Sequence, residues 1–460
     1  MNKNDEIELN ITAMSSDGVG IGRFDGMAVF VDNTAVGDTV KAHIIKVKSR
    51  YAIAIPTKII NPSPDRKEQS CPSFKSCGGC SYRHINYEAE LKIKQSTVND
   101  AINRIGGIPL ESNNIVPSPK ICAYRNKAQY PVAQKGNEIV YGFYAKHSHR
   151  VINGENCLLQ PPIFDGIMQI IKHWAQTYKI SAYNEESKSG ILRHIIIRYA
   201  ETSGEIMVMP VINADVLPKS EELKTALIEK IGKNLKCIAY NVNKKDTNVI
   251  TGDKCVFIYG NQNITDEICG VKLKISPLSF YQVNRSAAEL LYTAAAKYID
   301  NSDKILIDLF CGIGSIGLSI MNLTGDKSKK LYGVEIIPDA VENARQNAVL
   351  NGVDNAEFIC SNAAVAAKTL ETKGVKPDVV IVDPPRKGCT EDLLNTIVNG
   401  FMPKKLIYIS CDPATLARDV KIMSSYGYTL QEYTPFDLFP KTNHVETCVL
   451  ITRDKKGQNS

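Results

Sequence analysis

The sequence lacks the features that would place the protein in a membrane or outside the cell. Its 460 residues contain no apolar run of about 18 residues, the length that a membrane-spanning helix needs. The opening residues, MNKNDEIELN, are polar and charged, and they hold no apolar core of a secretion signal. We therefore expect a cytoplasmic protein that does not contact a membrane.

The sequence also lacks a strong bias in charge or composition. Lys and Arg number 55 against 49 Asp and Glu, and an excess of this size does not by itself identify a polyanionic partner. Hydrophobic residues make up 43% and charged residues 23% of the chain, which excludes a wholly disordered or collagen-like protein. Because 460 residues exceed what one ordinary core holds, we expect two or three domains.

Cysteine is plentiful but is not arranged as a disulfide framework. The chain has 13 cysteines, an odd number, and no sign of export to an oxidising compartment. Three of them follow the spacing Cys71-x5-Cys77-x2-Cys80, which is typical of metal ligands. A fourth ligand is needed, and the spacing does not choose between Cys122 and Cys157, nor between an iron–sulfur cluster and zinc.

The first 60 residues predict a small antiparallel barrel. Short stretches of alternating apolar residues are separated by glycine-rich turns, among which we count those at Gly20 and Gly22. A linker follows at 61–65. The apolar spacing over 82–105 then predicts an amphipathic helix that ends at Gly106.

Residues 120–150 combine basic side chains with tyrosines such as Tyr130 and Tyr141. This composition is typical of surfaces that bind a nucleic-acid backbone and stack on bases, although a strand-rich sheet with a charged outer face shares it. The two interpretations carry about equal weight. Over 160–275 we expect strands and a single helix near 219–232.

From about residue 285 onward, strand-like and helix-like segments alternate, which predicts a doubly wound α/β sheet with an antiparallel edge. The first strand ends at Asp308 and leads into Gly312-x-Gly314-x-x-Gly317, a turn that lets a nucleotide approach the backbone closely. Glu335 ends the next strand, where a carboxylate can accept both hydroxyls of a ribose. NAD enzymes and S-adenosylmethionine enzymes share this geometry, but Asp383-Pro-Pro-Arg386 is more typical of methyltransferases.

A cysteine follows the fifth strand of this sheet, at the start of a helix. In Ser410-Cys411-Asp412-Pro413, Asp412 can cap the helix and Pro413 can be its first residue. Cys411 would then face the positive end of the helix dipole, which favours a reactive thiolate. A buried cysteine without chemistry is the alternative. Glu446 begins the last strand, which we expect to open on the same face, although a lone glutamate there is usually just exposed.

Together these motifs resemble the bacterial iron–sulfur RNA 5-methyluridine methyltransferases of the type that acts on 23S ribosomal RNA, and the resemblance covers nearly the whole chain. It implies an OB-like, RNA-binding TRAM barrel at 1–60, a central α+β domain with a [4Fe-4S] site at 66–280, and a Rossmann-like class I methyltransferase domain at 281–455. Residues 82–115 are expected to pack on the last of these. The implied cluster ligands are Cys71, Cys77, Cys80 and Cys157.

The resemblance also implies roles in the reaction. Cys411, in SCDPATLARD, matches the nucleophile, and Glu446, in HVET, matches the general base; Asp412 stands where some members carry asparagine. Carbon 5 of uracil is a poor nucleophile, so a thiolate must add at carbon 6 and a base must later remove the proton at carbon 5. The expected S-adenosylmethionine contacts are Gln282 in Phe280-Tyr-Gln282-Val-Asn284, Phe310, Glu335 and Asp383, with Asp308, Gly312 and Gly314 at the turn.

The expected substrate is an unpaired or loop uridine in 23S ribosomal RNA, with no obligate protein partner. Three alternatives stay open. The same chemistry could act on transfer RNA. The Asp-Pro-Pro motif could belong to an amino-group methyltransferase, although that chemistry requires an aromatic residue, which stacks on the flipped base, at the position of Arg386. The chain could also be a non-catalytic iron–sulfur protein that binds RNA or senses redox state.

Overall fold

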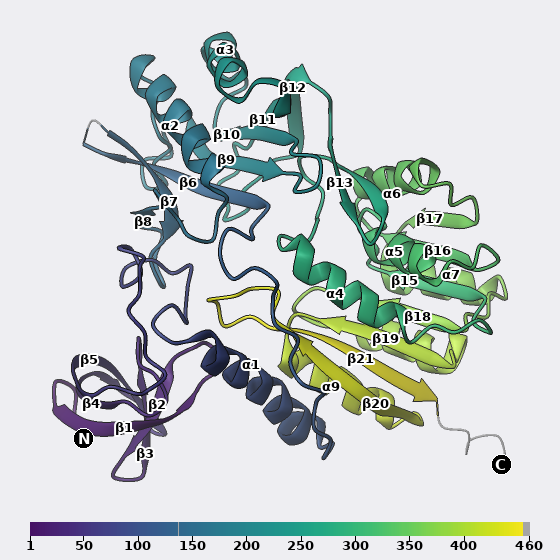
Figure 1. The fold of residues 1–460 in the computed structure, drawn as a ribbon, viewed down its shortest axis with the longest axis horizontal. Coiled ribbons are helices and arrows are strands. Elements are labelled where there is room, and N and C mark those ends of the chain that lie inside the picture. The colour runs from purple at the N-terminus through teal and green to yellow at the C-terminus, as the bar shows by residue number, and fades with distance from the viewer. Residues whose placement is uncertain (137, 454–460) are drawn as a thin grey trace.

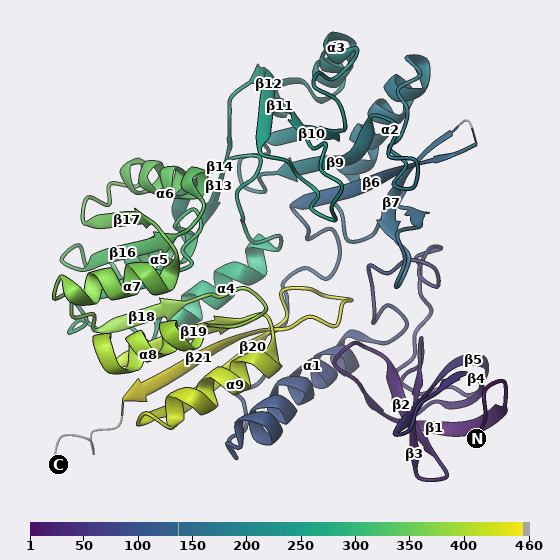
Figure 2. The same ribbon diagram turned by 180° about the vertical axis from the view of Figure 1, so that it is seen from behind.

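The computed structural model describes residues 1–136 and 138–453. Three main sheets succeed one another along the chain: an N-terminal barrel, a central sheet and a C-terminal sheet (Figure 1). Seen from behind, the barrel and the central sheet lie on one side of the molecule and the C-terminal sheet on the other (Figure 2). Among the described residues, no helix is long and apolar enough to cross a lipid bilayer.

The N-terminal barrel closes through five strands in the order β1-β2-β3-β5-β4. Their bounds are Glu6–Met14 (β1), Gly20–Phe24 (β2), Met27–Val31 (β3), Thr39–Val47 (β4) and Tyr51–Asn61 (β5). Alternate apolar residues on these strands, such as Leu9, Val29 and Val40, fill its interior. The barrel expected over the first 60 residues is confirmed.

Strand β2 corrects the sequence analysis, which assigned Gly20 and Gly22 to turns. Both lie within the strand, at positions where neighbouring atoms leave no room for a side chain. A Cβ on Gly22 would lie 2.5 Å from the carbonyl oxygen of Asn10 and 2.5 Å from Leu9 Cδ1. A glycine can mark close backbone approach as well as a turn, and the sequence pattern does not separate the two.

The central sheet has seven strands in the order β12-β11-β10-β9-β6-β7-β8. Their bounds are Lys127–Lys135 (β6), Glu138–Tyr144 (β7), Val151–Asn153 (β8), Leu192–Tyr199 (β9), Ile206–Ile212 (β10), Leu235–Val242 (β11) and Lys254–Gly260 (β12). Helices α2 (Pro162–Thr177) and α3 (Ser220–Ile231) pack against each other and on this sheet.

The sequence analysis predicts α3 but misses α2. Buried residues of α2 recur at the three- and four-residue spacing of a helix, as at Phe164, Ile167, Met168 and Ile171. The strand-like runs that follow in the sequence mask this spacing.

The tyrosines of the basic and aromatic stretch belong to the core of the central sheet. Tyr130 in β6 and Tyr141 in β7 are at most 1% exposed. They therefore cannot stack on RNA bases, and for these residues the interpretation as an ordinary sheet is the correct one.

The C-terminal sheet has the order β17-β16-β15-β18-β19-β21-β20. Its strands are Ile305–Leu309 (β15), Lys330–Glu335 (β16), Ala356–Cys360 (β17), Val379–Val382 (β18), Lys405–Ser410 (β19), Tyr428–Phe436 (β20) and Glu446–Arg453 (β21). The first five are parallel, and β21 runs antiparallel between β19 and β20. The doubly wound sheet with an antiparallel edge is thus confirmed.

Helices cover this sheet on both faces (Figures 1 and 2). They are α4 (Arg285–Ala296), α5 (Ser315–Thr324), α6 (Pro338–Leu350), α7 (Ala363–Thr372), α8 (Glu391–Asn395) and α9 (Pro413–Ser424). A hairpin of β13 (Ile264–Ile268) and β14 (Val271–Ile275) contacts α4, α5 and α6.

Helix α1 (Tyr87–Ala101) continues as a π-helical turn (Ile102–Gly106) and ends at Gly107, whose φ is +71°. It begins at Tyr87 rather than near residue 82, because Asn86 caps it. Val98 of α1 is buried in one hydrophobic cluster with Ala417 of α9, and the two helices lie side by side in both views (Figures 1 and 2). The domain boundaries themselves stay a prediction.

Gly22→Ala tests the crowding in β2. The added methyl group must displace the backbone at Asn10, so we expect the barrel to lose about 1–3 kcal/mol of stability. Gly166→Ala in α2 is the matched control, because a Cβ there meets no atom within 4 Å and alanine favours a helix over glycine by up to about 1 kcal/mol. Differential scanning calorimetry should show a lower unfolding temperature for Gly22→Ala only; equal curves would contradict the account.

Candidate active site

Cys411 and Glu446 lie at the adjoining ends of two neighbouring strands. β19 ends at Ser410, β21 begins at Glu446, and the antiparallel register pairs Ser410 with Thr447. Cys411 directly follows this last pair, and the charge of Glu446 acts on its thiol. The sheet therefore brings the expected nucleophile and the expected base together.

Helix α9 begins directly after Cys411, as the sequence predicts. The side chain of Asp412 accepts hydrogen bonds from the backbone N–H groups of Ala414 (3.0 Å) and Thr415 (2.9 Å). Pro413 is the first helical residue. This cap fixes the direction of the chain at Cys411.

The sequence predicts a thiolate at Cys411, and this prediction is wrong for the protein without its substrates. Burial, together with the negative charges of Glu446 and Asp383, raises the pKa of the Cys411 thiol to about 12. The helix terminus favours ionisation, but desolvation and the two carboxylates outweigh it. The charge of Arg386 acts in the opposite direction and lowers the thiol pKa.

Glu446 and Asp383, the two carboxyl groups that act on Cys411, have raised pKa values themselves. Glu446 is 4% exposed, and burial, followed by the charge of Asp383, raises its pKa well above the usual value. Burial likewise raises the pKa of Asp383 to about 7. Arg386 opposes the effect on Glu446, and Arg386 Nη2 lies 3.2 Å from His444 Nε2. Burial thus shifts both carboxyl groups toward their protonated forms.

The turn after β15 has the geometry expected of a nucleotide-type site. Asp308 is buried, and its Oδ2 accepts a hydrogen bond from the backbone N–H of Gly317 (2.9 Å). Its Oδ1 has no hydrogen-bond partner among the described residues, and burial raises the pKa of Asp308 to about 8. Gly312 and Gly314 have φ of +56° and +81°, and a Cβ on Gly312 would meet no atom within 4 Å. The open face of this turn fits a ligand that approaches the backbone closely.

Glu335 lies where the sequence places it, at the end of β16. Its Oε2 accepts a hydrogen bond from Gly312 N (3.2 Å), and its Oε1 accepts from the N–H groups of Ile336 (2.8 Å) and Ile337 (2.9 Å). These bonds hold the carboxylate at the rim of the glycine turn, a position that suits contact with a ribose.

The other expected cofactor residues surround the same turn or precede α4. Phe310 follows β15 with a φ of +71°, a conformation that a non-glycine residue adopts only where its surroundings force it. Gln282 is 5% exposed, and its backbone carbonyl accepts a hydrogen bond from Asn126 Nδ2 (2.9 Å). Direct contact of Phe310, Gln282 and Asp383 with a cofactor stays a prediction.

Buried ion pairs anchor the segment that precedes Glu446, residues 437–445, which we call the Glu446 loop. Lys94 of α1 donates to Asp437 (2.7 Å) and to Glu90 (3.0 Å), and Glu90 also pairs with Lys441 (2.7 Å). All four side chains are at most 2% exposed, so breaking one pair would leave a buried charge without a partner. The sequence analysis misses this network: Glu90 and Lys94 have the spacing of a helical ion pair, but such pairs are usually exposed.

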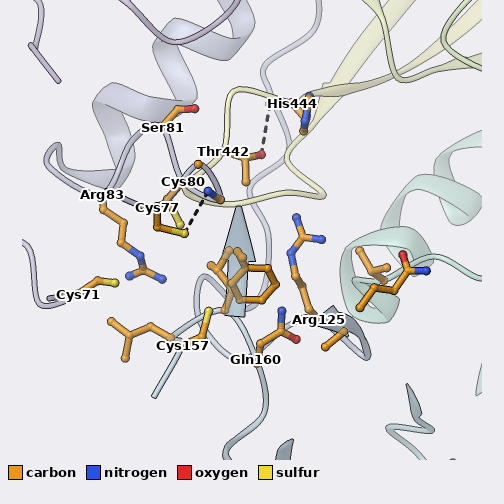
Figure 3. Close-up of a pocket in the computed structure, with 18 of the residues that line it drawn as sticks. Cys71, Cys77, Cys80, Ser81, Arg83, Arg125, Cys157, Gln160, Thr442 and His444 are labelled. Atoms are coloured by element: carbon orange, nitrogen blue, oxygen red, sulfur yellow. Dashed lines mark hydrogen bonds between the residues drawn. The ribbon is translucent and has the colours of Figure 1, made fainter. Parts of the chain in front are cut away.

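A cavity of about 520 Å³ lies between the Glu446 loop, the cysteine segment and the central sheet. The side chains that line it include those of Cys71, Cys77, Cys80 and Cys157. Figure 3 shows Arg83 among Cys71, Cys77 and Cys80 on one side of the cavity and Arg125 across from them. Gln160 lies beside Cys157, whose carbonyl oxygen accepts a hydrogen bond from the backbone N–H of Gln160 (3.0 Å). Cys122, the other candidate for a fourth ligand, is exposed and does not line the cavity.

The four thiols line one cavity, but they are not close enough together to form a metal site. The described residues contain no group of three or more His, Cys, Asp or Glu side chains placed to hold a metal ion. Burial raises the pKa of Cys80 to about 11 and the pKa of Cys157 above its usual value. Four thiols around one cavity are the donor set that an iron–sulfur cluster or zinc requires.

Comparison with known proteins decides the family. The family model described as tRNA (uracil-5-)-methyltransferase matches residues 86–454, and the TRAM domain model matches residues 2–57. The chain belongs to the tRNA (uracil-5-)-methyltransferase family. It is an S-adenosylmethionine-dependent RNA uracil-5 methyltransferase with an N-terminal TRAM domain, as the sequence analysis expects.

Similar proteins match along the whole chain. An uncharacterized RNA methyltransferase from Bacillus cereus is 42% identical over 461 residues, which cover 99% of this chain and 98% of the relative. One from Clostridium tetani is 40% identical over 457 residues, with the same coverage. The crystal structure of the Pyrococcus abyssi tRNA (uracil-54, C5)-methyltransferase with S-adenosyl-L-homocysteine is 26% identical, with a TM-score of 0.77, and the match covers 97% of this chain and 100% of that one.

The raised pKa of Cys411 predicts slow, pH-dependent alkylation. A thiol with a pKa of about 12 is protonated at neutral pH, so its rate with iodoacetamide should rise about tenfold per pH unit between roughly pH 7 and 10. Peptide mass spectrometry separates Cys411 from the other cysteines, and the exposed Cys360 serves as an internal control for the reagent. A rate that levels off below about pH 8 would indicate a thiolate and contradict this account.

Proposed function

We propose that this methyltransferase acts on carbon 5 of an unpaired uridine in 23S ribosomal RNA, with Cys411 as nucleophile and Glu446 as general base. The observation that carries the proposal is the pairing of β19 with β21, which ends at Ser410 and Thr447 and leaves Cys411 close enough to Glu446 for the charge of Glu446 to act on its thiol. The glycine turn with Glu335 at its rim suits S-adenosylmethionine, which supplies the methyl group when it is bound.

In the proposed reaction, Cys411 Sγ adds to carbon 6 of the uracil ring, and the ring electron pair makes carbon 5 nucleophilic enough to take the methyl group. Glu446 then removes the proton from carbon 5, and the bond between carbon 6 and Sγ breaks, which returns the thiolate. Cys411 must first lose its own proton. Asp383 can accept it, which leaves Glu446 free to take the proton from carbon 5, and Arg386 favours the ionised thiol.

The proposed [4Fe-4S] cluster would be held by Cys71, Cys77, Cys80 and Cys157, which line one cavity. A set of four thiols meets the ligand requirement of such a cluster, and no step of the methyl transfer passes through it. This ligand set is also what favours 23S ribosomal RNA, because it accompanies the 23S type in the family that the sequence resembles.

Transfer RNA is the second candidate substrate. The matching family model and the Pyrococcus abyssi structure are both named for methylation of transfer RNA. An amino-group methyltransferase has no comparable support, because that chemistry requires an aromatic residue at the position of the exposed Arg386.

The proposal predicts 5-methyluridine as the product. Protein purified without oxygen is incubated with S-adenosylmethionine and either unmodified 23S transcript or unmodified transfer RNA, and the nucleosides are identified by mass spectrometry. We expect 5-methyluridine from the 23S transcript and none with Cys411→Ala, which lacks the nucleophile. Product from transfer RNA alone would favour the second candidate. Methylated amino groups, or no methylation by cluster-loaded protein, would overturn the proposal.

Glu446→Gln should separate addition from release. Cys411 can still add to carbon 6, but the proton at carbon 5 stays in place, so the RNA remains bonded to the protein. We expect a heat-stable band of higher mass on a denaturing gel, and its absence from the Cys411→Ala/Glu446→Gln double variant. If Glu446→Gln forms no such band with an RNA that the wild type methylates, Glu446 is not the base.

A further inference from the structure

The cavity beside the Glu446 loop is basic and carries no balancing acid. Arg83, Arg125 and Lys127 line it, and no Asp or Glu among the described residues does. Burial, followed by the charge of Arg198, lowers the pKa of Lys127 to about 7, and no carboxylate offsets this. A partly buried ammonium group without a carboxylate beside it favours the binding of an anion, which restores its charged form.

Two polar side chains on this cavity have hydrogen-bonding capacity that the described residues leave unused. Gln160 and Arg83 are each 6% exposed, and Gln160 Oε1 and Arg83 Nη2 have no partner there. Arg83 lies among Cys71, Cys77 and Cys80, where the proposed cluster would be its neighbour (Figure 3). Gln160 lies between Cys157 and Arg125 in the same view. A buried amide oxygen without a partner indicates a ligand that donates a hydrogen bond.

An exposed aromatic ring lies at the same cavity. Phe280 lines it and keeps 64% of its surface exposed, whereas the next residue, Tyr281, is 3% exposed. Rings that remain open beside basic side chains are typical of sites where an RNA base stacks and its phosphate is held.

His444 connects this cavity to the reactive centre. It lines the cavity, and its Nε2 lies 3.2 Å from Nη2 of Arg386, whose charge acts on both Cys411 and Glu446. An RNA strand with its target base at Cys411 therefore brings an adjacent nucleotide to the cavity.

We propose that Arg125, Lys127, Gln160 and Phe280, here called the nucleotide wall, bind the nucleotide that flanks the target uridine. Its phosphate lies on Arg125 and Lys127, its base stacks on Phe280, and Gln160 accepts a hydrogen bond from the base edge. This inference rests on the proposed function, because it requires RNA as the substrate.

The salt dependence of RNA binding tests the phosphate contacts. Cluster-loaded, full-length protein with S-adenosylhomocysteine is titrated into a fluorescein-labelled, single-stranded, uridine-rich RNA, and anisotropy is followed at several salt concentrations. Each phosphate contact to a single strand contributes about 0.7 to the slope of log K against log salt. We expect Arg125→Gln/Lys127→Met to reduce the slope by about 1.4. Lys233→Met, at an exposed lysine after α3, is the control and should leave it unchanged.

Phe280→Ala tests the stacking contact separately. It should weaken binding about tenfold or more at every salt concentration without changing the slope, because stacking releases no counter-ions, and Phe280→Trp should restore binding. Tyr426→Ala removes a ring that is 48% exposed after α9 and is the matched control. Unchanged slope in the double variant together with unchanged affinity in Phe280→Ala would overturn the inference.

Two parallel measurements separate this inference from its alternatives. Formation of 5-methyluridine by the wild type tests the proposed function alone. If the wild type forms this product and the variants bind RNA as tightly as the wild type, only the nucleotide wall is contradicted. Iron content of each variant reports on the cluster. Loss of iron with an unchanged slope would mean that these side chains support the cluster rather than RNA, and it would overturn the inference.

Discussion

The antiparallel pairing of β21 with β19 is the contact on which the reactive centre depends. The five parallel strands supply the glycine turn, Cys411 and Asp383, but the proposed general base, Glu446, does not come from them. Only the returning strand, inserted between β19 and β20, brings Glu446 there. Because side chains alternate along a strand, a shift of this register by one residue would turn Glu446 to the other face of the sheet. The chemistry is thus fixed by backbone hydrogen bonds rather than by a mobile side chain.

The Glu446 loop ties this centre to the N-terminal half of the chain. On one side, Lys94 and Glu90 of α1 hold Asp437 and Lys441 through buried ion pairs. On the other side, the carbonyl oxygen of Lys441 accepts hydrogen bonds from the backbone N–H groups of Ser81 (2.8 Å) and Tyr82 (3.1 Å), directly after Cys80. The cysteine segment and the proposed base therefore share one anchor, so a change in the packing around the cysteines would reach Glu446 through a few rigid contacts.

Sequence reasoning succeeds where local chemistry decides the outcome. Asp412 and Pro413 start α9 as predicted, and the glycine turn after Asp308 follows its strand. It fails where neighbours distant in the sequence decide. Gly22 stands in a strand, at a position where Asn10 leaves no room for a side chain. Burial by elements distant in the sequence raises the pKa of Cys411, whereas the sequence predicts a thiolate there. A helix dipole can be read from a sequence, but desolvation cannot.

The position of Cys157 shows a further limit. Spacing left Cys122 and Cys157 equal as a fourth ligand, the family resemblance implied Cys157, and the folded chain places Cys157 on the cavity with the other three thiols.

The reaction itself is tested most directly by the fate of the hydrogen at carbon 5. With RNA carrying tritium at carbon 5 of uridine, the account predicts one tritium released to water for each methyl group transferred, and none released by Cys411→Ala. Methyl transfer without tritium release would contradict the central claim.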